Sequence, residues 1–275
     1  MDAEYVLPSP SIPDLSGYEP EDAAGALRGE WGLGEGPIAD IVSVMESHGV
    51  RVFSVTEASQ EVDAYSFWDE CRNRPFVFLM TSKSDERRHM DAAHELGHTV
   101  LHRKVDLEGI DSRGVERQAY SFGSAFLMPR SSFRASISRN ISLGEVMRVK
   151  QIWKMSAFAV VYRAHALGLL SDWQYHNLCV TMSKHGMRTT EPNSIAPEQS
   201  QVDDKVLELA KEDFGSTLAI SKATGVPHDL VMGLTFNLPI SVISGKLAKP
   251  PAGGSNDGMI QNFRLVDSEE ESFKS

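Results

Sequence analysis

The spacing of apolar residues changes twice along the first third of the chain, from helical to strand-like and back to helical. In GPIADIVSVMESHGV the apolar positions lie three or four residues apart and stop at Gly49, so this stretch predicts a helix. Three short runs rich in Val, Phe and Tyr follow, separated by polar segments. They predict the strands of a small sheet at 51–55, 63–68 and 75–80.

From Asp85 onward the spacing of apolar residues is helical. A helix is predicted from Asp85 to about Lys104, and another from about Arg113 to Leu127, where Pro129 ends it. Further helical segments are predicted at 142–152, 156–168, 171–184, 203–213, 216–224 and 227–236. The turn WKMS between the first two of these gives a helix-turn-helix-like outline.

Composition divides the chain into folded and polar parts. The first 20 residues hold four prolines with little apolar periodicity, and RTTEPNSIAPEQSQ has the composition of a linker. The predicted organisation is a disordered lead-in (1–20), an α+β domain (21–129), a helical, helix-turn-helix-like region (130–187), a linker (188–202), a small helical appendix (203–246) and a disordered tail (247–275). The expected fold class is therefore α+β, mostly helical with a small three-stranded sheet.

Length and cysteine usage suggest a protein that folds without covalent cross-links. The chain has 275 residues and two cysteines, Cys71 and Cys179, which lie far apart and fit a reducing compartment. The N-terminus shows neither a basic stretch nor an apolar core of the kind a secretion signal has. The longest apolar run, 156–170, contains Arg163 and His165 and is shorter than the ~20 residues that a spanning helix needs. We expect a cytoplasmic protein that does not enter a membrane.

The charge of the chain argues against general nucleic-acid binding. The net charge is −11, yet residues 130–163 contain seven Lys or Arg and a single acidic residue, Glu145. This basic stretch predicts either a solvated helical surface or a contact face for DNA or another acidic partner.

The predicted helix at 85–104 carries RRHMDAAHELGHTVLHR, which contains the motif HExxH. Residues four apart lie on one face of a helix, so His94 and His98 can bind one metal ion together. Neutral imidazoles leave the ion its full charge, and it can then activate a water molecule for hydrolysis. Glu95 is placed to act as the general base. The small residues Ala92, Ala93 and Gly97 would let another element approach closely.

A catalytic zinc site needs a third protein ligand, and His102 is the nearest candidate in sequence. Eight residues of helix give a rise of about 12 Å, however, which is too far for His102 to share an ion with His94. We therefore expect His102 to support a ligand from behind or to lie at the surface.

A carboxylate from another helix is the better third ligand. Glu116 begins ERQAYSFGSAFLMP, on a helix that can fold back antiparallel beside the motif. The other candidates lie in the connecting loop, where they are less rigidly held: Asp106, Glu108 and Asp111. Tyr120 lies one turn after Glu116, so its hydroxyl either approaches the oxyanion of a substrate or packs against a neighbouring element.

These segments resemble the ImmA/IrrE-type metallo-endopeptidases, zincin-like proteases of bacteria and phages. ERRHMDAAHELGHTVLH and VERQAYSFGSAFLMP are similar to the two signature helices of that family, and the resemblance extends over roughly 24–193. His89 and Met90 stand where the family is expected to have Arg and Phe.

The resemblance implies a zincin-like fold for 21–129 and a Zn²⁺ cofactor, with Mn²⁺ as an alternative. It also implies that His94, His98 and Glu116 hold the metal, that Glu95 activates water, and that the substrate is a helix-turn-helix repressor or antitoxin.

Two other functions remain open from the sequence. One is a regulatory module that binds DNA or an antitoxin and has a structural metal, with DNA contacted by 130–163. The other is metal-dependent hydrolysis of a small molecule, since HExxH by itself does not specify the substrate.

Overall fold

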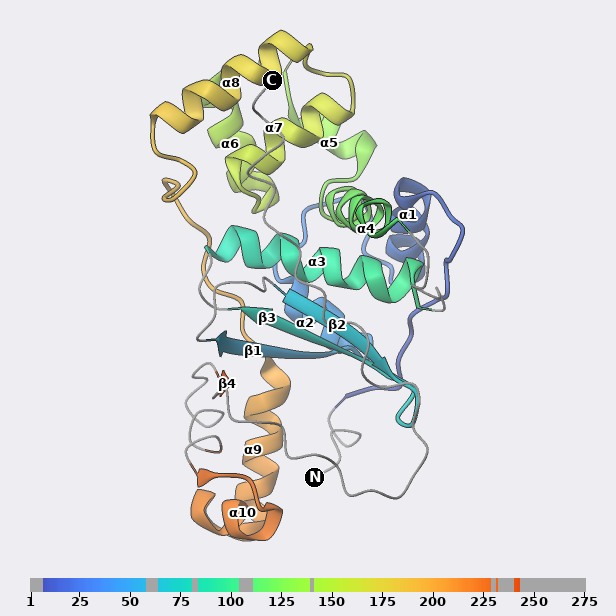
Figure 1. The fold of residues 1–275 in the computed structure, drawn as a ribbon, viewed down its shortest axis with the longest axis vertical. Helices are drawn as coiled ribbons and strands as arrows, with labels where there is room; N and C mark the ends of the chain where they lie inside the picture. Colours follow the sequence, from blue (N-terminus) through green and yellow to red (C-terminus); the bar gives the residue numbers. More distant parts are fainter. Residues whose placement is uncertain are drawn as a thin grey trace.

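A small mixed β-sheet lies under the helix that carries the HExxH motif (Figure 1). The computed structural model describes residues 7–57, 64–80, 84–103, 111–138, 141–228, 231 and 240–242. The strands are β1 (Arg51–Glu57), β2 (Ala64–Asp69), β3 (Arg74–Met80) and β4 (Ile240–Val242). The helices are α1 (Pro20–Glu30), α2 (Ile41–Ser47), α3 (Asp85–Leu101), α4 (Ser112–Leu127), α5 (Arg130–Ser136), α6 (Leu143–Trp153), α7 (Ala157–Ala166), α8 (Asp172–Lys184), α9 (Gln201–Phe214) and α10 (Thr217–Thr224).

The strand order in the sheet is β2-β3-β1-β4, with β2 antiparallel to β3 and the other pairs parallel. Successive side chains of a strand point to opposite faces. Val52, Val77 and Leu79 are accordingly buried on one face. The other face carries stacked aromatic rings, among them Phe53 and Phe78, whose centroids are 5.1 Å apart. All three predicted strands form, and the α+β fold class is confirmed.

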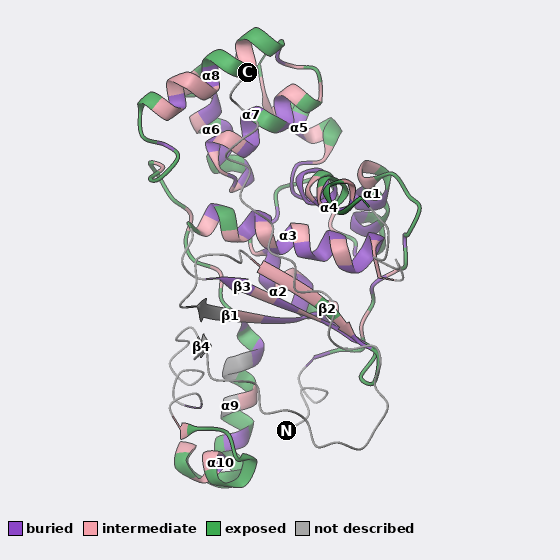
Figure 2. Ribbon diagram, viewed as in Figure 1, coloured by how far each residue is buried: buried purple, intermediate pink, exposed green. Residues whose placement is uncertain are grey.

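Helix α3 runs along the sheet through the centre of the molecule (Figures 1 and 2). It starts at Ser84, whose side chain accepts a hydrogen bond from the Arg87 amide, as an N-cap does. Acidic residues Asp85 and Glu86 occupy the first turn, where the helix dipole favours negative charge. Because α3 packs against β2 and β3 on one side and α4 on the other, most of its residues are buried.

The remaining helices lie at the two ends of this central part. Helices α5 to α8 form a group at one end, and α9 with α10 projects from the other (Figure 1). Helices α9 and α10 are largely exposed, with a small buried cluster of Ala210, Ile220 and Val231 (Figure 2). Among the described residues, no helix is both long and apolar enough to cross a membrane.

The interpretation of residues 1–20 as a disordered lead-in is wrong for the part that the structure describes. Leu7, Ile12 and Leu15 are buried against the core. The Leu15 amide donates to the Val100 carbonyl over 3.0 Å, which joins this segment to α3. Prolines disfavour helix and ladder pairing, but they are compatible with an extended segment that lies along a surface. The apolar residues between the prolines are irregularly spaced, so their pattern in the sequence does not predict that they are buried.

The segment 188–202, predicted as a linker, lies between α8 and the first residues of α9, and it is held to the rest of the fold. Its side chains are fixed to three different helices. Glu191 accepts a hydrogen bond from Lys150 of α6 over 2.8 Å, and Glu198 lies 2.6 Å from His89 of α3. Ser200 donates to Glu46 of α2. His89 thus has a partner, Glu198, from a segment more than 100 residues away in the sequence.

The predicted appendix at 203–246 is helical at α9 and α10 but contains a strand as well. Residues 240–242 form β4, which pairs with β1 from Val55 to Glu57. Three residues are too few to show a clear alternation, so a pattern could not distinguish them from the end of a helix. Of the helix predicted at 227–236, only residues 227, 228 and 231 are described, and the tail 247–275 lies outside the described residues.

Candidate metal centre

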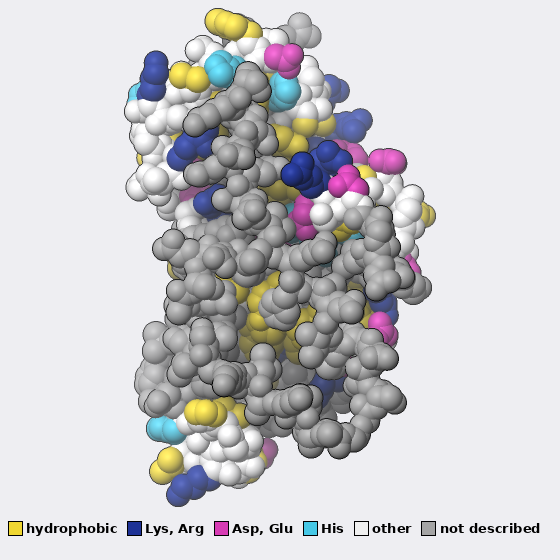
Figure 3. Space-filling view, viewed as in Figure 1, with side chains coloured by type: hydrophobic (Ala, Val, Ile, Leu, Met, Phe, Trp, Pro, Cys, Tyr) yellow, Lys and Arg dark blue, Asp and Glu magenta, His cyan; other side chains and the backbone are white. Residues whose placement is uncertain are grey.

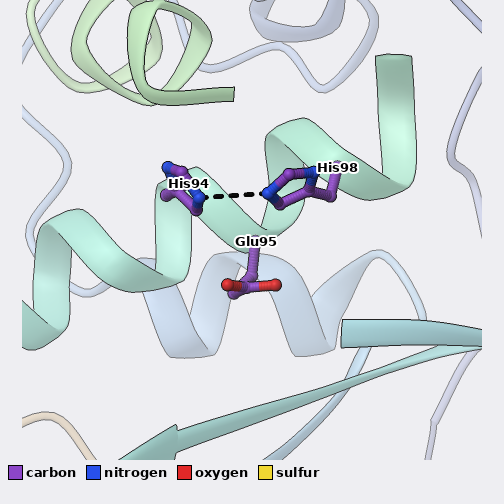
Figure 4. A group of neighbouring side chains, drawn as sticks. All are labelled: His94, Glu95 and His98. Atoms are coloured by element: carbon purple, nitrogen blue, oxygen red, sulfur yellow. Dashed lines mark hydrogen bonds between the residues drawn. The ribbon is translucent and has the colours of Figure 1, made fainter. Parts of the chain in front are cut away.

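The two motif histidines lie side by side on one face of α3 (Figure 4). One helical turn separates them, and their Nε2 atoms are 3.0 Å apart. Both rings are mostly buried, with side-chain exposures of 19% for His94 and 21% for His98. The predicted convergence of the two imidazoles is therefore present in the folded chain.

Helix α4 brings the carboxylate of Glu116 to the same point. Glu116 Oε2 lies 3.0 Å from His94 Nε2, and Glu116 Oε1 lies 3.5 Å from His98 Nε2. Zinc in a tetrahedral site holds nitrogen and oxygen ligands at 2.0–2.2 Å, which places the ligand atoms about 3.3 Å from one another. The distances of 3.0–3.5 Å among the two Nε2 atoms and the Glu116 oxygens are close to this spacing. Two imidazoles and one carboxylate are three ligands, so the residues fit a catalytic type of metal site.

Glycines let α4 approach α3 closely enough for this convergence. A Cβ atom at Gly123 of α4 would lie 3.0 Å from the backbone nitrogen of His94 and 3.1 Å from the carbonyl carbon of Ala93. A Cβ at Gly97 of α3 would lie 3.1 Å from the carbonyl oxygen of Ala119 on α4. The two helices touch backbone to backbone at these positions, and Glu116 reaches the histidines as a result.

A Gly123→Ala substitution should therefore disturb the metal site as well as the core. The added methyl group has to push α4 away from α3, and overpacking of this kind costs about 1–3 kcal/mol. We expect a lower urea midpoint and weaker zinc binding in a competition with a chromophoric chelator. Gly25→Ala is the control, because a Cβ at Gly25 in α1 meets no atom within 4 Å. Unchanged stability and zinc affinity in Gly123→Ala would disprove the close-contact role.

The charges in the metal centre favour an ionised carboxylate. Burial opposes the charge on Glu116, but hydrogen bonds and charge from His94 and His98 outweigh it and lower the pKa of the carboxyl well below its usual range. Burial likewise works against protonation of His94, while Glu116 and Glu95 raise the pKa of its imidazole overall. A positive charge is thus stabilised at the point where these three side chains meet.

Glu95 leaves α3 on the side that faces the strands, away from the two imidazoles (Figure 4). It is 5% exposed, and Ser66 of β2 donates a hydrogen bond to its Oε2 over 2.6 Å. Ligand atoms of His94, Glu95 and His98 all lie within 4.8 Å of one another, so this group could hold a metal ion. Sequence reasoning missed Ser66, because nothing marks a strand serine 29 residues before the motif.

His102 is the C-cap of α3 and does not reach His94. Its Nδ1 instead lies 3.2 Å from His98 Nδ1, on the side of that ring away from His94, and its Nε2 lies 3.0 Å from Gln118 Oε1. Burial lowers the pKa of the His102 imidazole. Tyr120 packs edge to face on Tyr162 of α7, with ring centroids 5.2 Å apart.

The loop carboxylates that compete with Glu116 fall into two groups. Asp111 caps α4 and accepts a hydrogen bond from the Arg113 amide over 3.1 Å. It also forms an ion pair with Arg117 at 3.4 Å, so its side chain is engaged away from the histidines. Asp106 and Glu108 lie outside the described residues.

A mixed sheet under a helix that carries HExxH, with a carboxylate from the next helix, defines a zincin-like α+β protein with a site of the metallopeptidase type. Residues 45–165 match the model of the IrrE N-terminal-like domain of peptidase family M78. This range includes β1 to β3, α3 and α4, and the match supports the ImmA/IrrE-type family that the resemblance predicted. The family acts on protein substrates. No curated protein matches the chain.

Proposed function

We propose that the protein is a zinc-dependent endopeptidase that cleaves a helix-turn-helix repressor or antitoxin. One observation carries the proposal: His94, His98 and Glu116 meet at ligand spacing, while Glu95 is held separately beside them. Two imidazoles and a carboxylate suit zinc, which binds nitrogen and oxygen ligands in tetrahedral sites.

Glu116 is assigned as the third ligand in preference to Glu95 for two reasons: its distance to the two imidazoles, and the hydrogen bond that engages Glu95 with Ser66. Glu116 is within 3.5 Å of both Nε2 atoms, and its own hydrogen-bond partners are these histidines. Glu95 is adjacent in sequence to His94 and points toward β2, where Ser66 holds it. Glu95 is therefore free of the ligand role and suited to move protons.

Each residue then has a separate task in peptide hydrolysis. Zinc, when bound, supplies a Lewis acid that polarises the substrate carbonyl and makes water easier to deprotonate. Glu95 takes a proton from the attacking water and delivers it to the leaving amine. The hydrogen bond from Ser66 fixes the orientation of the Glu95 carboxylate during both transfers. The ring of Tyr120 packs against Tyr162, and it is assigned no step in these transfers.

The arrangement of ligands favours catalysis over a purely structural metal. A structural zinc site is usually closed by four protein ligands. In the part of the chain that the structure describes, the one group of three or more His, Cys, Asp or Glu side chains with ligand atoms within 4.8 Å of one another is His94, Glu95 and His98, and Glu116 lies within 3.5 Å of both imidazoles. Three ligands leave a position for water and substrate.

The basic stretch gives little support to DNA binding, because two of its charges are buried in ion pairs and its other described basic residues have partners within the chain. Lys150 is fully buried between Glu86 and Glu191, and Arg163 is 4% exposed with both terminal nitrogens on Glu21. The other described basic residues of 130–163 have partners too: Arg130 with Glu21, Arg134 with the Leu167 carbonyl, Arg148 with Glu145 and Lys154 with the Ala39 carbonyl. On the face that Figure 3 shows, described Lys and Arg side chains lie beside acidic, hydrophobic and other side chains.

The substrate class comes from the family resemblance. Repressors and antitoxins of the helix-turn-helix type act on DNA in the cytoplasm, so we place the protein there. Small-molecule hydrolysis stays as the alternative activity for the same metal centre.

The test is cleavage of a purified helix-turn-helix repressor, the class of substrate that the family resemblance implies. The zinc-loaded full chain is incubated with that repressor, and the products are read by intact-mass spectrometry. We expect two fragments from a single peptide bond, none after treatment with a chelator, and recovery when zinc is added back. Cleavage that continues at the same rate after complete metal removal would refute a zinc-dependent mechanism, and an intact repressor would refute this substrate.

A further inference from the structure

A chain of three side chains leads from the metal centre to the surface of α4. His98 Nε2 faces His94 and Glu116, while His98 Nδ1 lies 3.2 Å from His102 Nδ1. The other nitrogen of His102, Nε2, lies 3.0 Å from Gln118 Oε1. Each contact joins two atoms at hydrogen-bond distance, so each needs one donor and one acceptor.

Proton positions in this chain depend on one another. A neutral imidazole has one N–H donor and one acceptor nitrogen, and only the acceptor nitrogen can bind a metal. If His98 Nε2 is to bind the metal, its proton has to sit on Nδ1 and point at His102. His102 Nδ1 then has to accept, which leaves the His102 proton on Nε2. That proton points at the amide oxygen of Gln118, which can only accept.

We infer that Gln118 and His102 are positioning residues that hold His98 in the tautomer with a free Nε2. The inference rests on the proposed function in one respect, that His98 is a metal ligand. The amide oxygen of Gln118 anchors the order of protons, and His102 transmits it to the ligand. Metal-binding histidines commonly have their second nitrogen fixed by a hydrogen-bond partner, and loss of that partner weakens metal binding by 10–100-fold.

The remaining contacts of the metal centre agree with this order of protons. With His98 Nε2 as an acceptor, the Nε2–H of His94 can donate toward it and toward Glu116 Oε2, both at 3.0 Å, in the metal-free protein. If the proton of His98 were on Nε2, its Nδ1 would be an acceptor. His102 would then have to carry its own proton on Nδ1 to donate to it. His102 Nε2 would then be an acceptor facing the Gln118 oxygen, which is repulsive.

The position of His102 in the fold explains why it has this task and not that of a ligand. It follows His98 by one helical turn, so its ring reaches the back of His98 but not the point shared with His94. Gln118 lies on α4, the helix that also carries Glu116. Helix α4 thus contributes a metal ligand directly and, through Gln118, the orientation of a second ligand on α3.

The experiment compares substitutions that remove or keep the acceptor at position 118. Gln118→Met removes it with little change in volume, and Gln118→Glu keeps an acceptor oxygen. His102→Phe removes both nitrogens of the intermediate ring. Arg117→Met is the control, because Arg117 is 74% exposed and pairs with Asp111 away from the chain of imidazoles. Circular dichroism checks that each variant folds.

The first measurement is the tautomer of His98 in the metal-free full chain at pH 8, from long-range ¹⁵N–¹H correlation spectra. We expect the Nδ1–H form in wild type, Gln118→Glu and Arg117→Met, and a mixture with the Nε2–H form in Gln118→Met. The second is the zinc dissociation constant by chelator competition. It should rise by about 10–100-fold in Gln118→Met and His102→Phe and by less than about threefold in the other two.

The two measurements separate this inference from the proposed function. Neither uses a substrate, so a chain that binds zinc but cleaves no repressor can still show the tautomer shift. An Nε2–H form in wild type would overturn the inference, as would an unchanged tautomer in Gln118→Met, even if zinc binding were weaker there. Gln118→Met that matches wild type in both measurements would overturn it as well.

Discussion

A Glu95→Gln variant should lose repressor cleavage by about 10²–10⁴-fold, the usual contribution of a general acid–base residue, while it keeps its zinc. Glutamine has the same shape, and its amide oxygen can still accept the hydrogen bond from Ser66. It cannot take up a proton from water, however. The three ligand atoms of His94, His98 and Glu116 are not altered, so one zinc per chain should remain by elemental analysis.

A Glu116→Leu variant is the matched comparison, since it also removes one acidic group beside the histidines. It should lose both zinc and cleavage, because two imidazoles alone hold zinc weakly at a site built for three ligands. Zinc that is lost from Glu95→Gln and retained by Glu116→Leu would exchange the roles of the two carboxylates. Cleavage by Glu95→Gln at the rate of wild type would remove Glu95 from the mechanism.

The centre of the metal site was predictable because its geometry is local. The spacing of His94 and His98 depends only on the period of a helix, and the helix itself is marked by its apolar positions. Glu116 required one further step, that the next helix folds back antiparallel. The structure places Glu116 beside both histidines, and the assignment of roles to these residues rests with the experiments above.

Residues that depend on contacts between distant segments could not be found in this way. Ser66 reaches Glu95 only because β2 lies beside β3 in the sheet, near α3. A short apolar run in the sequence predicts a strand, but it predicts neither the strand order nor the register. Gln118 resembles any polar residue on a helix surface. The basic stretch was interpreted as solvated or as a contact face, because charge in a sequence does not show whether its partner comes from another segment.

Lys150 is the clearest case, and it leads to a large expected effect on stability. Its side chain is fully buried, and Nζ lies 2.9 Å from Glu86 Oε1 and 2.8 Å from Glu191 Oε2. Glu191 also accepts from the Ala157 amide at the start of α7 over 2.9 Å, and Glu86 accepts from the Ile195 amide over 3.3 Å. This ion cluster ties α3, α6, α7 and the segment 188–202 together at one buried point.

Removing Lys150 should destabilise the fold by about 3–5 kcal/mol, because two buried carboxylates then lose their counter-ion. The measurement is the free energy of unfolding of Lys150→Met from urea titration. Arg148→Met is the control on the same helix, since Arg148 pairs with Glu145 at the surface, and it should change stability very little. If the loss comes from uncompensated charge, adding Glu86→Gln and Glu191→Gln to Lys150→Met should restore part of it.

The pH dependence of the same cluster gives an independent check. Burial opposes ionisation of Glu86, but the hydrogen bond and charge of Lys150 outweigh it and hold the pKa of this carboxyl below its ordinary value of 4.5. A lowered pKa in the folded state adds stability above pH 4.5 that is lost as the pH falls below it. Wild type should therefore show this acid-side loss, and Lys150→Met should show less of it, since the cause of the lowered pKa is gone. Equal pH profiles for the two proteins, or a stability loss in Lys150→Met no larger than in Arg148→Met, would show that the buried ion cluster does not stabilise the fold.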